Sequence, residues 1–149
     1  MKTILRGSAL AGAAATFLLM GSLAQASSLP PVHHNGAVEY LSGGIGQDES
    51  TAIEHASKKW PLTLEFAVKD KKHAEFTADV KVVVRDAKQH QTLQTESNGP
   101  FLLAKLKPGK YEVDATLDGK TLHEKVDVRH DHPAKLMFVW PSGTAAKSS

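Results

Sequence analysis

Apolar and polar residues alternate one by one through much of the chain after residue 61. This period of two is typical of β-strands with one buried face, because successive side chains of a strand point to opposite sides of the sheet. Some segments alternate clearly, and others alternate less regularly or are mostly apolar. Together they are residues 62–68, 80–85, 92–97, 101–106, 111–117, 122–128 and 136–140. The pattern therefore predicts about seven short strands.

Turn-forming residues separate these segments. Asn98-Gly99-Pro100 and Lys107-Pro108-Gly109 interrupt the alternation, and Asp118-Gly119 is the signature of a type I′ hairpin. Short strands with a turn about every 8–12 residues are typical of an antiparallel β-sandwich. The chain has no glycine-rich phosphate loop and no alternation of strands with helices, which argues against a nucleotide-binding α/β fold. We expect a mainly β, antiparallel β-sandwich at residues 62–140.

One helix is expected before the sandwich, at residues 47–61. Within it, Ile53, Ala56 and Trp60 recur at helical spacing and form a narrow apolar stripe. Pro61 ends the segment, because proline lacks the backbone N–H that a continuing helix needs. A helix with one apolar face must bury that face, so we expect it to pack on the sandwich.

The first 26 residues have the pattern of a secretory signal peptide. Lys2 and Arg6 give a positive start, residues 9–23 are mostly apolar, and Ala24-Gln25-Ala26 matches the small-x-small cleavage signature. The apolar stretch is shorter than the roughly 20 residues that a membrane-spanning helix needs, and no later stretch is long enough. We expect cleavage after Ala26 and a periplasmic or secreted product without a transmembrane segment.

Two flanking segments lack strong periodicity. Residues 27–46 are rich in Ser, Pro and Gly and are expected to form a flexible arm, whereas residues 141–149 are small and polar and are expected to form a disordered tail. Four apolar residues of the arm are candidates for docking on the domain: Val38, Tyr40, Leu41 and Ile45.

The composition narrows the range of functions. The chain has 149 residues and no cysteine, which excludes disulfides, thiol catalysis and thiolate metal ligands. Its 18 Lys and Arg residues become 16 once Lys2 and Arg6 leave with the leader, which equals its 16 Asp and Glu residues. A mature chain without net positive charge gives no reason to expect a nucleic-acid partner.

The centre of the chain resembles a known family. An apolar strand at residues 101–105 is followed by Leu-x-Pro-Gly-x-Tyr-x-Val at residues 106–113 and by the hairpin at Asp118-Gly119. This arrangement resembles the carboxypeptidase regulatory-like domains, which are small β-sandwiches of the transthyretin-like (prealbumin-like) kind, in a small exported proteobacterial version. The resemblance covers roughly residues 62–140 and implies a transthyretin-like or immunoglobulin-like sandwich of about seven strands. Within the motif, Tyr111 is expected to point inward with its hydroxyl available to tie the adjacent turn.

Histidine is the residue type with an unusual count, eight in all. The best cluster is His130-Asp131-His132. In an extended backbone His130 and His132 would point the same way, as two metal ligands could, with Asp131 as a further ligand or supporting partner. His33-His34 and His123 could approach them. Because imidazole suits Zn(II) and Cu(II), a periplasmic metal-binding protein is the alternative function, although the favoured interpretation includes no cofactor.

The sequence carries no pattern typical of an enzyme. It has no Gly-x-Ser-x-Gly elbow, Asp48 and Glu49 fit the start of a helix, and Glu112 and Asp114 fit the polar face of a strand. The transthyretin-like hydroxyisourate hydrolases end in Tyr-Arg-Gly-Ser, which is absent after Trp140. We therefore expect a non-enzymatic binding or accessory module of the bacterial envelope, whose partner is another envelope protein or a cell-wall polymer.

Overall fold

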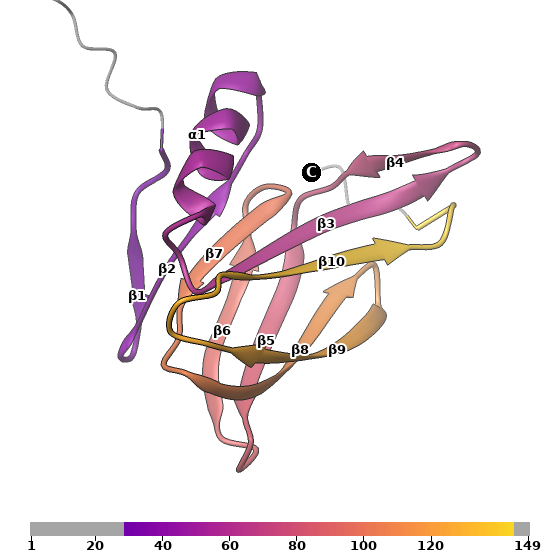
Figure 1. Ribbon diagram of the computed structural model, residues 1–149. Helices are drawn as coiled ribbons and strands as arrows, with labels where there is room; N and C mark the ends of the chain where they lie inside the picture. The colour runs from indigo at the N-terminus through magenta and orange to yellow at the C-terminus, as the bar shows by residue number, and fades with distance from the viewer. Residues whose placement is uncertain (1–28, 145–149) are drawn as a thin grey trace, which may run out of the picture.

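The computed structural model describes residues 29–144, and most of them lie in strands of two facing sheets (Figure 1). The larger sheet has six strands in the order β1-β2-β7-β3-β10, with β4 also paired to β3, and the smaller sheet has four in the order β6-β5-β8-β9. The elements are β1 (His33–Asn35), β2 (Val38–Gly43), α1 (Gln47–Ser57), β3 (Leu62–Asp70), β4 (His73–Phe76), β5 (Val80–Asp86), β6 (Gln91–Ser97), β7 (Phe101–Lys105), β8 (Gly109–Leu117), β9 (Lys120–Val128) and β10 (Ala134–Trp140). The predicted leader at residues 1–26 lies outside the described residues, as do residues 145–149 of the predicted tail.

Side chains from alternate positions of both sheets fill the space between them. Val82 and Val113 of the smaller sheet are fully buried in the same cluster as Phe66, Phe138 and Trp140 of the larger sheet. The three aromatic rings lie next to one another, with centroids 5.9–6.3 Å apart. The mainly β, sandwich-like arrangement predicted from the period of two is confirmed.

The number of strands differs from the prediction. The described part of the chain holds ten strands rather than about seven. Two of the additional strands, β1 and β2, lie within residues 27–46, which the composition predicted as a flexible arm, and β2 pairs with β7 from Glu39 to Gly43. The third, β4, forms a hairpin with β3. β1 and β4 have only three and four residues, which is too few for a period of two to be recognised in the sequence.

One strand pair is parallel, which corrects the prediction of an antiparallel sandwich. β10 runs parallel to β3, with Ala134 opposite Leu62 and Trp140 opposite Val68. The chain reaches this position from β9 by crossing from the smaller to the larger sheet. A period of two specifies which face of a strand is buried, but it carries no information on the direction of the neighbouring strand.

Strand β3 is buried on both faces, whereas the alternation predicted one exposed face. Leu64 and Phe66 point into the core, and the outward-facing Thr63, Glu65 and Ala67 are also buried. The strand pairs with β7 and β4 along one edge and with β10 along the other. β3 is therefore the central element of the larger sheet.

Helix α1 packs on the outer face of the larger sheet, as its apolar stripe predicted. It ends at Ser57, earlier than the predicted residue 61, and the chain turns before Pro61. The apolar cluster beneath it consists of Leu41, Ile53, Trp60, Phe101 and Leu103, with Leu29 and Ala56 at its margin. This second, smaller core covers β2 and β7.

Glycines permit close packing where β2, α1 and β7 meet. A Cβ atom on Gly99 would collide with the backbone of Gly43, and a Cβ atom on Gly44 would collide with the Phe101 ring. Gly44 also has a φ of +100°, which favours glycine. Its backbone N–H donates a hydrogen bond to the Glu49 carboxylate at 2.7 Å, which ties the first turn of α1 to the end of β2.

The predicted hairpin at Asp118-Gly119 is confirmed. Both residues have positive φ, 50° for Asp118 and 74° for Gly119, as the two central residues of a type I′ turn require. Leu117 and Lys120 pair directly across the turn. This turn sets the register of β8 against β9, and with it the order of side chains on the outer face of the smaller sheet.

Replacing Trp60 with alanine should lower the free energy of unfolding by about 3 kcal/mol, because the change leaves a cavity between α1 and the larger sheet. The Trp60 ring is 7% exposed and also lies 4.9 Å from the Lys105 ammonium. Denaturant unfolding followed by circular dichroism measures the effect. Lys59→Ala, next in the chain and exposed, is the matched control and should change stability little; equal stability of both variants would contradict the packing.

Candidate functional site

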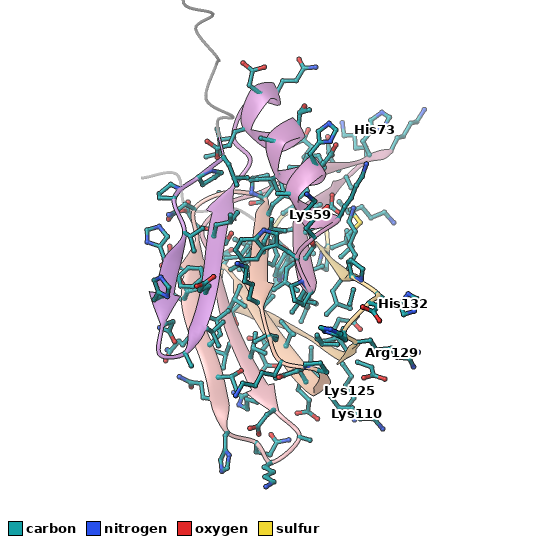
Figure 2. The ribbon with its side chains drawn as sticks, turned by 60° about the vertical axis from the view of Figure 1, so that its left-hand side comes forward. Lys59, His73, Lys110, Lys125, Arg129 and His132 are labelled. Atoms are coloured by element: carbon teal, nitrogen blue, oxygen red, sulfur yellow. The ribbon has the colours of Figure 1, made fainter. Side chains whose placement is uncertain are left out.

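The structure does not give the predicted histidine cluster the geometry that the metal hypothesis needs. His130 and Asp131 are the central residues of a tight turn between β9 and β10, closed by a bridge between Arg129 and His132. All four residues are exposed, and Figure 2 shows the side chains of Arg129 and His132 at the surface. Because the backbone reverses between His130 and His132, the extended conformation that would place their side chains on one side is absent.

The other histidines considered as ligands lie elsewhere. His123 is on β9, where its ring is hydrogen bonded to Asp114, and His33 and His34 are on β1, at the opposite end of the larger sheet from β10. Among residues 29–144 no group of three or more His, Asp or Glu side chains is placed to hold a metal ion. The described structure therefore does not bring His130, Asp131 and His132 together with a third candidate ligand.

The outer face of the smaller sheet carries a ladder of paired charges. Asp114 on β8 accepts hydrogen bonds from Arg85 on β5, at 2.6 Å, and from the ring of His123 on β9. The Arg85 guanidinium holds the pKa of Asp114 below its ordinary value of 3.8, partial burial works against this, and the His123 hydrogen bond lowers the pKa further. This network joins three neighbouring strands and is half-exposed.

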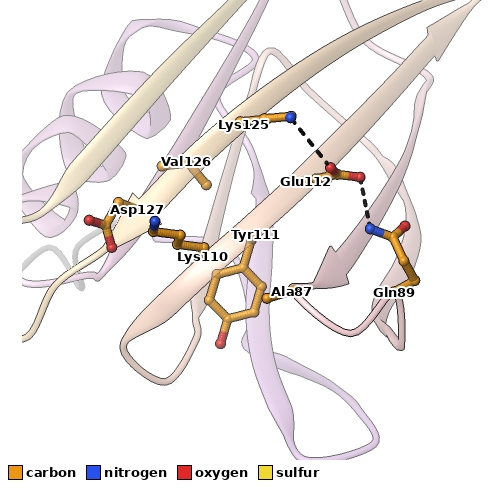
Figure 3. A pocket seen from close by; sticks show the side chains of 8 residues that line it. All are labelled: Ala87, Gln89, Lys110, Tyr111, Glu112, Lys125, Val126 and Asp127. Carbon is orange, nitrogen blue, oxygen red and sulfur yellow. Dashed lines mark hydrogen bonds and ion pairs between the residues drawn. The ribbon is translucent and has the colours of Figure 1, made fainter.

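A shallow depression of about 360 Å³ lies at one end of this ladder (Figure 3). Glu112 lines one side of it, with the Gln89 amide 3.3 Å from one carboxylate oxygen and the Lys125 ammonium 3.9 Å from the other. Lys110 and Asp127, which face each other across β8 and β9, complete its charged rim. Alternating donors and acceptors of this kind suit contact with a polar surface, and the Glu112 carboxylate already has partners.

Tyr111, which also lines this depression, has a structural role. Its hydroxyl donates a hydrogen bond to the Lys107 carbonyl oxygen at 2.7 Å, which ties the turn before β8 as the sequence motif predicted. Burial raises the pKa of Tyr111, and the nearby Asp86 carboxylate raises it further. The hydroxyl therefore stays protonated at neutral pH and keeps donating to the turn.

The outer face of the larger sheet is apolar beyond the edge of α1. Phe76 on β4, Ala67 on β3 and Val139 on β10 lie side by side in register, and Met137 follows on β10 opposite Glu65. We call Phe76, Ala67, Met137 and Val139 the apolar strip. Its three large side chains are exposed by 59% (Phe76), 48% (Met137) and 40% (Val139). They are three of the five large exposed apolar residues in the described part of the chain.

Strand β10 forms an open edge beside this strip. In the described structure it pairs with β3 alone, and no strand is hydrogen bonded along its other side. The Trp140 indole N–H donates to the Lys120 carbonyl oxygen at 2.9 Å and ties the end of β10 to the start of β9. Five consecutive residues, Leu136–Trp140, are apolar, and the one charged residue of the strand, Lys135, is held by Glu65 at 2.8 Å. A long apolar edge strand is the usual template for adding a strand from another chain.

The other edges of the two sheets are protected. β1 is three residues long, and on that side of the molecule the Thr95 hydroxyl donates to the Tyr40 hydroxyl oxygen at 3.1 Å, linking β6 to β2. Asn35 also donates to the Gln94 carbonyl at 3.3 Å. β9 carries charged side chains on both faces, including Glu124 at an inward position of the ladder. Inward charges and short strands are common devices against edge pairing, and β10 has neither.

The apolar strip and the open edge are not predicted from the sequence. In the apolar run at residues 136–140, the period of two selects only Leu136, Phe138 and Trp140, which do point inward. The intervening Met137 and Val139 were the available signal, because five apolar residues in a row cannot all face one core in a strand.

No known protein-family model matches the chain, and no curated protein matches it. Within residues 29–144, no helix is long and apolar enough to cross a membrane.

Replacing Asp114 with asparagine should lower the free energy of unfolding near neutral pH by about 1 kcal/mol, because Arg85 and His123 lose a charged acceptor. Because folding lowers the pKa of this carboxyl, its stabilisation is fully present above its ordinary pKa of 3.8 and is lost as pH falls below that value. The stability gap between wild type and variant should therefore close on acidification. Thermal unfolding against pH measures it; Asp131→Asn, in the exposed turn, is the control, and a gap that persists at low pH would contradict the assignment.

Proposed function

We propose that this chain is an exported, non-enzymatic accessory module of the bacterial envelope that binds another envelope protein by adding a strand of that protein to β10. The observation that carries the proposal is the open, apolar β10 edge in a molecule whose other sheet edges are short, bridged or charged. Backbone hydrogen bonds to an added strand would supply affinity, and pockets for alternate side chains would supply specificity.

The surroundings of the edge support a protein partner over a small substrate. Met137 and Val139 present apolar side chains next to the unpaired backbone, so an added strand would bury apolar surface as well as form hydrogen bonds. The depression at Glu112 is shallow, and the Glu112 carboxylate is paired within the molecule.

We further propose that residues 62–140 form a carboxypeptidase regulatory-like, transthyretin-like domain, with β1, β2 and α1 added in front. The support is the motif at residues 106–113 together with the hydrogen bond from Tyr111 to the turn. Export is proposed from the leader pattern and cleavage after Ala26.

A photocrosslinking amino acid at position 137 should yield one discrete product with an envelope protein in the cells that make this chain. The same amino acid at position 121, exposed on β9, is the matched control and should not yield that product. Val139→Lys in the position-137 chain should abolish the product, because a charge at the edge opposes strand addition. Equal products from both positions, or a product containing this chain alone, would contradict the proposal.

A further inference from the structure

The hairpin of β3 and β4 extends away from the body of the two sheets, and Figure 1 shows its turn at the far end of the larger sheet. The turn region carries Lys69, Lys71 and Lys72, and His73 follows, labelled at the tip in Figure 2. All four residues are exposed. Within residues 29–144 none of the three lysines forms an ion pair; the Asp70 carboxylate accepts a hydrogen bond only from the backbone N–H of Lys71.

These lysines border the apolar strip. Lys69 is two residues after Ala67 and therefore on the same face of β3. It is the next outward-facing residue after the row of Phe76, Ala67 and Val139. Lys135 lies at the other end, one position below Met137 on the same face of β10. The outer face therefore presents apolar side chains with lysines at both ends.

Negative charge is nearly absent from this part of the face. Glu65 is the one outward-facing acid of β3, and it is 7% exposed and bonded to Lys135 at 2.8 Å. Asp70 and Glu75 occupy register positions on the opposite face of the hairpin, Asp70 opposite His73 and Glu75 opposite Val68. Exposed apolar groups next to the unpaired Lys69, Lys71 and Lys72 are complementary to a surface that is apolar inside and anionic outside.

We propose that this face docks on an anionic lipid surface. Phe76, Met137 and Val139 enter the headgroup region, while Lys69, Lys71 and Lys72 contact lipid phosphates. Amphipathic surfaces of this composition bind membranes by burying apolar area and by attraction to anionic lipid. The exposed groups are spread over three adjacent strands, and the depression at Glu112 does not include them. A broad surface of this kind suits a bilayer better than a single inserted peptide.

The lipid contact does not rest on the proposed partner of β10. The two proposals share Met137 and Val139, whereas Lys71 and Lys72 of the hairpin belong to the lipid contact alone and the unpaired backbone of β10 to strand addition alone. Variants of Lys71 and Lys72 therefore test the lipid contact separately.

Co-sedimentation of the chain beginning at Ser27 with lipid vesicles tests the proposal. Removing the leader ensures that residues 9–23 cannot account for binding. The chain should bind phosphatidylethanolamine–phosphatidylglycerol vesicles and bind phosphatidylcholine vesicles much more weakly. The double variant Lys71→Gln/Lys72→Gln should reduce partitioning to the anionic vesicles by about tenfold or more at low salt.

Two further variants test whether vesicle binding depends on this face or only on the net charge of the chain. Lys88→Gln/Lys107→Gln makes the same change in net charge at exposed lysines in other turns, before β6 and before β8, and should alter partitioning less than about twofold. Phe76→Ser should also weaken binding, with circular dichroism confirming that its packing against Phe101 is not needed for folding. Equal losses in the two lysine double variants, equal binding to both lipids, or no binding to either would overturn the proposal; the last result would instead favour an acidic protein as the occupant.

Discussion

The structure depends on the burial of β3 on both of its faces. One face closes the main core through Leu64 and Phe66. On the other face Thr63, Glu65 and Ala67 are buried beside side chains of the neighbouring strands, with Glu65 opposite Phe101 of β7. Both edges of the strand are hydrogen bonded, to β7 and β4 on one side and to β10 on the other. Next to β3 on the outside of the sheet, α1 buries Ile53 and Trp60 against Leu41, Phe101 and Leu103 of β2 and β7.

Helix α1 is too narrow to cover the whole outer face of the larger sheet. A helix is roughly 10 Å across with its side chains, and strands are about 4.8 Å apart, so one helix covers about two strands. Helix α1 lies over β2 and β7, where Ile53 and Trp60 complete a second core. Over β4, β3 and β10 no helix follows in the described residues, and Phe76, Met137 and Val139 are exposed there. The exposed surface is therefore a consequence of how the fold is covered.

The sequence predicted the local structure well because local structure is determined by neighbours in the chain. The period of two located the strands from β5 to β10, Asp118-Gly119 located the type I′ turn, and Ile53 and Trp60 located the buried face of α1. The direction of β10 and the pairing of β2 with β7 depend on contacts between residues far apart in the chain, which no local pattern records.

The same difference between local and long-range contacts explains which features of the candidate sites the sequence predicts. The metal hypothesis for His130, Asp131 and His132 required an extended backbone, but the chain must turn there to cross between the sheets. The open edge of β10 could not be predicted from its own residues, because an apolar run such as Leu136–Trp140 is equally suited to the centre of a sheet. The topology puts β10 at the edge of the larger sheet. The proposed addition of a strand depends on this edge position.

Amide hydrogen exchange along β10 is the most direct test of this account. In an edge strand with a parallel neighbour, every second residue donates to that neighbour and the residues between them point to the open side. For the isolated chain beginning at Ser27, measured residue by residue by NMR, slow and fast exchange should therefore alternate from Ala134 to Trp140, while β3 exchanges slowly from Leu62 to Val68. Slow exchange at every residue of β10 would show that its outer edge is covered and would contradict the account.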